Sequence, residues 1–209
     1  MTSFSVCVAV RRFFVFYGAD MKKLEERIER DGIVLPGDVL KVGSFVNQNI
    51  DVPFMCEVAD ELVRLYDGSK ITKVLTVEAS GIGFACLVAE RLGVSVLFAK
   101  KNKSSNVADD VYSAEVVSYT HGVVNHVIVS KKFLGPSDRV LIVDDFLATG
   151  SALLGLISLC RDAGAEIAGC GVIIEKAYQS GGEAVRKLCR VESLARIASM
   201  DPEKGFVFI

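Results

Sequence analysis

The hydrophobic positions of this chain follow two alternating patterns along most of its length. One is a short continuous apolar run, typical of a strand buried on both faces of a parallel sheet. The other is an amphipathic stretch with a helical period, as in the segments that begin at Ile82, Ser151 and Gly181. Strands that alternate with helices predict an α/β fold with a doubly wound, mostly parallel sheet. The predicted parallel strands are residues 74–77, 94–99, 140–143 and 168–175.

Two regions depart from this alternation. Residues 112–119 and 123–129 are strand-like runs with a turn between them, and they predict a hairpin inserted into the sheet. Ahead of the first parallel strand, an amphipathic helix begins after Met21, and residues 39–46 predict a short extended segment. Pro53 then opens a further predicted helix, because proline suits the first turn of a helix.

The first twenty residues differ from the rest of the chain. This apolar segment is broken by Arg11 and Arg12, so neither side is long enough to span a membrane. It also lacks the basic start and the cleavage site of a secretory signal. We therefore expect residues 1–20 to be an extension outside the fold, either an upstream start-codon artefact or a targeting presequence. The folded domain is expected over residues 21–209.

Composition narrows the class of protein. A chain of 209 residues, 51% of them hydrophobic, can build one sizeable α/β core. Its formal net charge of −2, without a long basic run, gives no electrostatic footprint for nucleic acid. The six cysteines are scattered without a C-x-x-C pair, which favours reduced thiols in a cytosolic protein over a zinc site.

The segment VLIVDDFLATGSA, residues 140–152, carries the strongest chemical signal. An apolar strand ends in the carboxylates Asp144 and Asp145, and a small turn then leads into a helix. The free N–H groups at the start of a helix attract phosphate, and carboxylates accept hydrogen bonds from sugar hydroxyls or lie near Mg²⁺. The segment therefore predicts a site for a sugar and its phosphate. The turn and helix start consist of Ala148, Thr149, Gly150, Ser151 and Ala152.

This segment resembles the signature of the type I phosphoribosyltransferases, which bind 5-phosphoribosyl-1-pyrophosphate (PRPP). The resemblance implies the fold of that family, with Asp144 and Asp145 facing the ribose hydroxyls. It implies that the residues from Ala148 to Ala152 hold the 5′-phosphate. Mg²⁺ is expected to bind through PRPP, with no metal ion predicted directly on the protein.

Two further segments resemble parts of the same family. The residues Glu78, Ala79, Ser80 and Gly81 resemble the loop whose backbone N–H groups bind pyrophosphate. The basic segment at residues 100–105 resembles the loop that covers PRPP, with Lys101 supplying positive charge. Closure of that loop would exclude water from a reactive ribosyl cation.

The residue before Thr149 and the end of the strand at 168–175 bear on the base that is accepted. Enzymes for hypoxanthine and guanine usually carry an acid where this chain has Ala148. Lys176 offers only donors, so it matches the O6 and N7 acceptors of a 6-oxopurine and opposes the amino group of adenine. Adenine enzymes resemble this strand but carry an apolar residue at the lysine position.

The stretch from Met21, together with TVEASG, VIIEKAYQ and VESLARI, resembles bacterial xanthine phosphoribosyltransferases. That resemblance implies a small N-terminal hood, in which Leu40 packs on the purine and Asn47 forms a hydrogen bond with it. It implies a cytosolic purine-salvage enzyme that transfers the phosphoribosyl group to xanthine and works as a homodimer, without a nucleic-acid or membrane partner. An adenine or guanine phosphoribosyltransferase, or a PRPP- or purine-sensing regulator on the same fold, is the alternative. No residue can be named as a general base.

Overall fold

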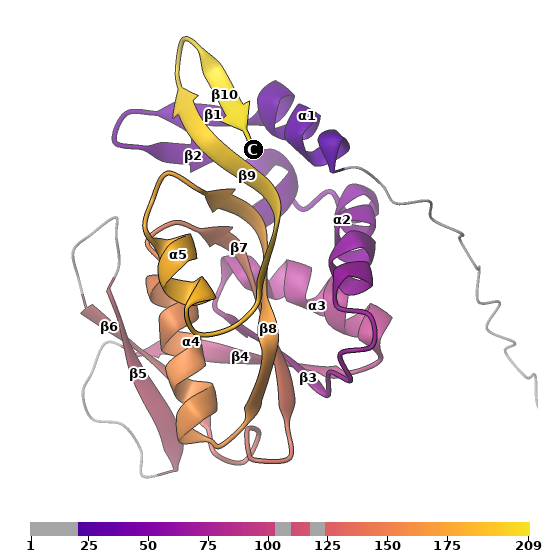
Figure 1. Cartoon of the computed structure of the whole chain (residues 1–209), viewed down its shortest axis with the longest axis vertical. Helices are drawn as coiled ribbons and strands as arrows, with labels where there is room; N and C mark the ends of the chain where they lie inside the picture. Colours follow the sequence, from indigo (N-terminus) through magenta and orange to yellow (C-terminus); the bar gives the residue numbers. More distant parts are fainter. Residues whose placement is uncertain (1–20, 103–109, 118–123) are drawn as a thin grey trace, which may run out of the picture.

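An eight-stranded mixed sheet forms the centre of the chain in the computed structural model, which describes residues 21–102, 110–117 and 124–209 (Figure 1). The strand order is β10-β9-β8-β7-β3-β4-β6-β5. Five neighbouring strands are parallel and form the body of the sheet: β3 (Lys73–Val77), β4 (Ser95–Asn102), β7 (Arg139–Leu147), β8 (Glu166–Lys176) and β9 (Val191–Asp201). The antiparallel strands lie at the two edges: β5 (Val111–Val117), β6 (Val124–Ser130) and β10 (Gly205–Phe208).

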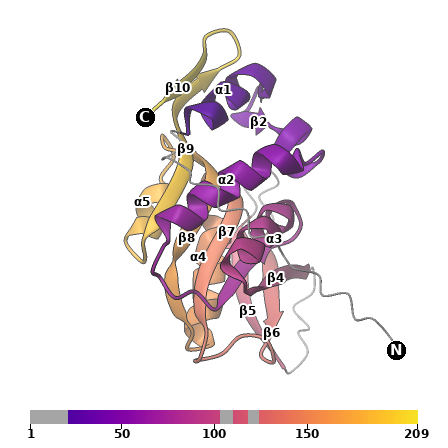
Figure 2. The same cartoon turned by 90° about the vertical axis from the view of Figure 1, so that its right-hand side faces the viewer.

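Helices cover both faces of the sheet, as a doubly wound fold requires. Two of them pack on one face (Figure 2) and two on the other: α2 (Val52–Leu65) and α3 (Ser80–Leu92), then α4 (Ser151–Asp162) and α5 (Gly181–Arg186). Successive residues of a strand point to opposite faces, so Val74 lies in the first core and Leu75 in the second. The continuous apolar runs in the sequence arise because both faces are buried.

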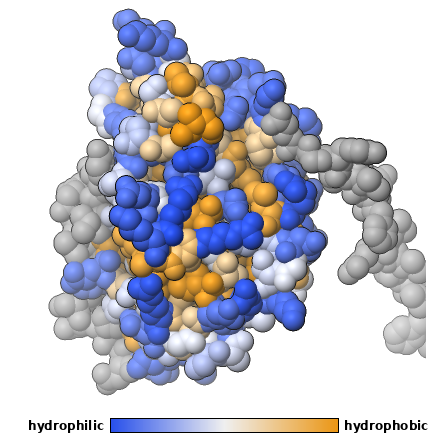
Figure 3. All heavy atoms as spheres, viewed as in Figure 1, coloured by the Kyte–Doolittle hydropathy of each residue, from blue (hydrophilic) through white to orange (hydrophobic). Residues whose placement is uncertain are grey.

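The predicted insertion is an antiparallel pair, with Ser113 of β5 opposite Ile128 of β6. Its connecting turn lies outside the described residues, as do residues 1–20. On the face that carries α4 and α5, hydrophobic residues gather over the centre between groups of hydrophilic ones (Figure 3). No helix of the described residues is both long enough and apolar enough to cross a bilayer.

A small hood lies above the carboxyl ends of β7 and β8 (Figure 1). The expectation of an extended segment over residues 39–46 is wrong for its second half, because a π-helical turn follows the strand. Phe45 and Val46 are neighbours and both buried, which one helical turn permits and an alternating strand does not. The hood consists of α1 (Lys22–Asp31), β1 (Ile33–Leu35), β2 (Val39–Lys41) and the turn η1 (Gly43–Asn47).

The C-terminal part also differs from the sequence pattern. The helix expected from Gly181 has six residues, and the strands β9 and β10 then form an antiparallel pair that the sequence pattern did not reveal. Polar residues such as Glu192 and Arg196 interrupt the apolar run of β9, and this hides the strand. The pair extends the sheet beyond β8 and borders the hood.

Candidate active site

Three segments that lie far apart in the sequence meet at the carboxyl ends of β3, β4 and β7. They enclose a cavity of about 230 Å³. In an open α/β sheet this edge is where ligands gather. Ala79 and Gly81 belong to the same turn without lining the cavity. The predicted residues that line it are Glu78, Ser80, Lys101, Asp144, Asp145, Ala148, Thr149, Gly150, Ser151 and Ala152.

The turn after β7 has the geometry that anion binding needs. Gly150 has a φ of +81°, in the left-handed region that side chains other than glycine rarely adopt. This allows α4 to begin at Ser151, so that its first-turn N–H groups, which lack helical acceptors, border the cavity. The hydroxyl oxygens of Thr149 and Ser151 lie 3.1 Å apart beside them. The turn can therefore surround an anionic group with backbone and side-chain donors.

The two carboxylates that follow the apolar part of β7 are buried, with exposed fractions of 5% for Asp144 and 6% for Asp145. Burial, reinforced by the neighbouring charge of Asp145, raises the pKa of Asp144 well above its usual range. Asp145 accepts hydrogen bonds from Ser80 Oγ at 3.0 Å and from Asn47 Nδ2 at 2.8 Å. This one carboxylate therefore connects β7 with the turn after β3 and with the hood.

The turn after β3 approaches the acid pair very closely. A Cβ atom on Gly81 would lie 2.3 Å from Thr76 Oγ1 and 2.9 Å from Asp144 Oδ1, so only glycine fits there. Glu78 accepts a hydrogen bond from the backbone N–H of Lys101 at 2.6 Å and so joins β4 to this turn. The rest of the basic segment, from residue 103, lies outside the described residues.

Thr76 is a buried polar residue that the sequence argument missed. Its hydroxyl has no hydrogen-bond partner within the described part of the chain, and it lies below the turn at Gly81. A polar residue inside the apolar run 74–77 was the available signal. Thr76 Oγ1 and Asp144 Oδ1 both lie close to Gly81, so Thr76 packs beneath the turn that adjoins Asp144.

A second cavity, of about 350 Å³, lies under the hood and shares Phe146 and Ala148 with the first. Leu40, from the hood, and Lys176, from the end of β8, both line it. Lys176 Nζ donates a hydrogen bond to the backbone oxygen of Asp38. The ammonium also lies 3.6 Å from a carboxylate oxygen of Asp38, and with three N–H donors it can still donate a hydrogen bond to a ligand.

Asn47 does not line the cavity that contains Lys176. Its side chain instead borders a neighbouring cavity of about 400 Å³, to which Leu40 also contributes, and it donates to Asp145. Asp38, which the sequence argument did not select, lies between hood and sheet and accepts hydrogen bonds from Tyr178 and Gln179. Its φ of +64° places it in the turn that Pro36 and Gly37 signal in the sequence, although that signal does not identify the contacts of Asp38.

The carboxylate groups near the first cavity suit a magnesium ion that arrives bound to a substrate. In the described ranges, no three His, Cys, Asp or Glu side chains are grouped to hold a metal ion. The carboxylates of Glu78, Asp144 and Asp145 nevertheless border one cavity. Mg²⁺ is commonly bound by one or two carboxylates together with substrate phosphates and water.

The family model of the phosphoribosyl transferase domain matches residues 55–193 of the sequence, which is about two thirds of the chain. The match includes all three loops that line the first cavity. The chain belongs to the phosphoribosyltransferase family. This phosphoribosyltransferase is 52% identical to the xanthine phosphoribosyltransferase of Lachnoclostridium phytofermentans, over 90% of this chain and 97% of the relative. It is 50% identical to the protein of that name from Bacillus cereus strain AH187, over 87% and 92% of the two chains.

Solved structures confirm the expected fold. An APRTase from Giardia lamblia in complex with 9-deazaadenine matches with a TM-score of 0.68 at 29% identity, over 77% of this chain and 87% of that one. The adenine phosphoribosyltransferase of Rhodothermus marinus matches with a TM-score of 0.68 at 20% identity, over 84% and 99%. The second match supports the architecture alone.

Proposed function

We propose that this phosphoribosyltransferase acts in purine salvage and transfers the phosphoribosyl group of PRPP to N9 of xanthine, with xanthosine 5′-monophosphate and pyrophosphate as products. Relatives that carry the xanthine name at about 50% identity support this proposal. The observation that carries it is the position of Lys176 in the cavity under the hood. This cavity adjoins the one formed by the turn from Ala148 to Ala152, which is called the phosphate turn below. A charged donor at that position suits the acceptor edge of a 6-oxopurine.

The first cavity binds PRPP in this proposal. The turn from Ala148 to Ala152 holds the 5′-phosphate through the N-terminal N–H groups of α4. Asp144 and Asp145 accept hydrogen bonds from the ribose hydroxyls. The turn from Glu78 to Gly81 and the cation of Lys101 hold the diphosphate. Mg²⁺, which arrives with PRPP, would balance the negative charge of the diphosphate.

Catalysis then follows mainly from orientation and charge. The carboxylates Asp144 and Asp145 lie near the ribose, where a cationic sugar develops as the bond to the diphosphate breaks. The hood and Lys176 hold the purine so that N9 faces the anomeric carbon, which replaces a bimolecular encounter with a fixed geometry. No described side chain is assigned as a general base.

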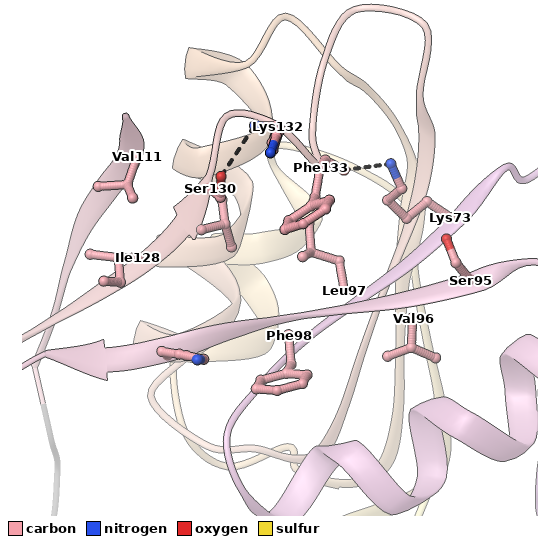
Figure 4. Close-up of a pocket in the computed structure, with 12 residues that line it drawn as sticks. Lys73, Ser95, Val96, Leu97, Phe98, Val111, Ile128, Ser130, Lys132 and Phe133 are labelled. Carbon is pink, nitrogen blue, oxygen red and sulfur yellow. Dashed lines mark hydrogen bonds between the residues drawn. The ribbon is translucent and has the colours of Figure 1, made fainter. Parts of the chain in front are cut away.

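The proposal includes a homodimer through the hollow between β4 and β6. A cavity of about 630 Å³ lies between β4 and β6 (Figure 4), and Phe98 and Phe133 at its border are 38% and 57% exposed. Exposed aromatic residues around an apolar hollow are typical of a protein contact. A second copy seated here would lie beside Lys101, three residues after Phe98 on β4, which fits the predicted basic loop near the partner's site.

Sedimentation tests the dimer directly. We expect the native protein to sediment as a dimer at micromolar concentration, and Phe98→Glu to shift it towards the monomer. A native protein that is monomeric and fully active at that concentration would contradict this part of the proposal.

A cytoplasmic location is also proposed, and it rests on the cysteines. The described cysteines are free thiols, and the sulfurs of Cys170 and Cys189 lie only 3.5 Å apart without a bond. Cysteines scattered without a C-x-x-C pair favour reduced thiols in the cytosol.

One assay tests the central proposal. Nucleotide formation from PRPP and Mg²⁺ is measured with xanthine, guanine, hypoxanthine and adenine, each over a range of concentrations. We expect xanthine to have the highest kcat/KM and adenine the lowest. A preference for adenine would overturn the assignment of the base, and the absence of product with all four bases would overturn the activity.

A further inference from the structure

The helix α5 packs directly behind the phosphate turn, a contact that no sequence pattern indicated. A Cβ atom added to Gly181, the first residue of α5, would lie 2.2 Å from the oxygen of Ala148 and 2.4 Å from the nitrogen of Gly150. From the other side, a Cβ on Gly150 would lie 3.1 Å from Gly181 Cα and 3.3 Å from Val185 Cγ2. Backbone therefore rests on backbone, and a shift of α5 must move the turn or leave a gap behind it.

An ion pair between a buried carboxylate and a partly exposed arginine holds α5 in this position. Glu175, at the end of β8, is 2% exposed, and its two carboxylate oxygens each accept a hydrogen bond of 2.6 Å from Arg186 on α5. Burial alone would raise the pKa of Glu175, but the hydrogen bonds of Arg186, the nearby hydroxyl of Ser193 and the charges of Arg186 and Arg196 together outweigh it, and the pKa is lowered. A Cβ on Gly182 would lie 2.1 Å from Glu175 Oε1, so the carboxylate fits closely against the start of the helix.

We propose that Arg186 is a positioning residue for PRPP, which fixes the phosphate turn by clamping α5 to Glu175. The proposal rests on the phosphate-binding role proposed above for the turn. Arg186 lines neither the first cavity nor the cavity under the hood, so in this arrangement it acts through α5 and not by direct contact with a substrate. The two-point contact matters, since a planar guanidinium on a carboxylate fixes orientation as well as distance.

Arg196 offers a matched control within the same cluster. It donates to the same carboxylate, Glu175 Oε2, at 3.1 Å, but it lies on β9 and not on α5. Loss of Arg196 takes one charge partner from Glu175 and leaves α5 clamped. A difference between the two arginines therefore reports the position of α5 and not merely the charge balance of Glu175.

The experiment measures PRPP binding by calorimetry and the KM values of PRPP and xanthine for Arg186→Met and Arg196→Met, well below their melting temperatures. We expect Arg186→Met to weaken PRPP binding about tenfold, because small displacements of binding groups have large effects on fixed sites. The xanthine KM should stay within about twofold, and Arg196→Met should bind PRPP within about twofold of the native protein. Arg186→Lys, which keeps the charge without the planar fork, should fall between native and Arg186→Met.

Equal losses in the two methionine variants, or an equal rise of both KM values in Arg186→Met, would overturn the positioning role. If Arg186→Met does not fold, the pair Arg186→Lys and Arg196→Lys decides, with the same criterion applied to their PRPP affinities. Failure of the proposed function is distinguishable, because the native protein would then not bind PRPP at all.

Discussion

The two cavities of the candidate active site are built in opposite ways. The phosphate turn and the acid pair come from one strand–turn–helix unit, in which β7 is buried on both faces and α4 follows directly. The base pocket is assembled between Leu40 in the hood and Lys176 on β8, and a hydrogen bond from Lys176 to Asp38 joins residues 138 positions apart. The first cavity is thus fixed by the core of the domain, whereas the second depends on the docking of the hood.

This difference leads us to expect that PRPP and the purine base are recognised by different parts of the protein. In the proposed assignment, the core-built cavity binds PRPP and the hood-built cavity binds the base. The residues of the hood-built cavity can change without disturbing the sheet. Variants of the two cavities should therefore separate by substrate, with PRPP affected through the core and the purine affected through the hood.

The largest effect is expected from Gly150→Val in the core-built cavity. The φ of +81° is strained for valine, and its Cβ would meet Gly181 at 3.1 Å. We expect PRPP affinity to fall more than about a hundredfold while the fold largely survives. Calorimetry with PRPP and circular dichroism are the measurements.

Gly68→Val is the control for that substitution. Gly68 also has a positive φ, +74°, but a Cβ there would meet nothing within 4 Å, and the residue lines neither cavity of the site. It should lose stability through backbone strain and keep its PRPP affinity. Normal PRPP binding by Gly150→Val would mean that the phosphate turn is wrongly assigned.

The next effect concerns the base pocket. Lys176→Leu removes a charged donor from a buried site, which corresponds to about 1.5–3 kcal/mol, or about ten- to more than a hundredfold in kcat/KM for xanthine. PRPP binding should change little, since the phosphate turn is built separately. Adenine use should rise relative to xanthine, because the opposing donor is gone. The measurement is kcat/KM for both bases.

Lys204→Leu, an exposed lysine in the turn between β9 and β10, serves as the control and should leave the ratio unchanged. If Lys176→Leu also leaves the xanthine-to-adenine ratio unchanged, Lys176 does not read the base. The base assignment would then rest on the relatives alone.

The same contrast explains how much the sequence revealed. The parallel strands and the helices between them were predicted from the sequence. A strand that is buried on both faces consists of a continuous apolar run, such as residues 140–143. The family was recognised from the strand–turn–helix segment, since its chemistry is local. The strand β9 was missed because Glu192 and Arg196 interrupt its apolar pattern, and the π-helical turn at Gly43–Asn47 has no simple periodicity.

Long-range contacts account for what the sequence could not show in the site. The hydrogen bond from Asn47 to Asp145 spans 98 positions, and the clamp between Glu175 and Arg186 depends on how α5 folds back on β8. Gly181 reads as an ordinary helix start, yet its lack of a side chain is required by the backbone of Ala148. Such constraints arise from packing and leave no local pattern.

A smaller effect is expected at the junction of the two cavities. Asn47→Ala removes a neutral donor to Asp145, worth about 1 kcal/mol, or about fivefold. Because Asn47 connects the hood to the ribose acid, the KM values of both xanthine and PRPP should rise. Ser80→Ala removes the other donor to Asp145 and should raise the KM of PRPP only. A rise confined to xanthine in Asn47→Ala would show that this side chain leaves Asp145 and serves the base alone.

The smallest effect is a change in stability at Asp144, which tests whether the core-built cavity sacrifices stability for binding. Burial raises the pKa of Asp144 in the folded protein, so the folded protein holds this proton more tightly than the unfolded chain does. Raising the pH from about 4, the usual pKa of an aspartate, up to the raised pKa must then lower the free energy of unfolding of the native protein.

Asp144→Asn removes this titration. Its melting temperature should match that of the native protein near pH 4 and exceed it by a margin that grows as the pH is raised to 8. PRPP affinity should fall at the same time, because an amide cannot replace a carboxylate at the ribose. The measurement is calorimetric melting of both proteins from pH 4 to pH 8, with the exposed substitution Asp162→Asn as the control. A difference in melting temperature that does not grow with pH would show that the burial of Asp144 has no cost for the fold, and the contrast between the two cavities would then lie in connectivity alone.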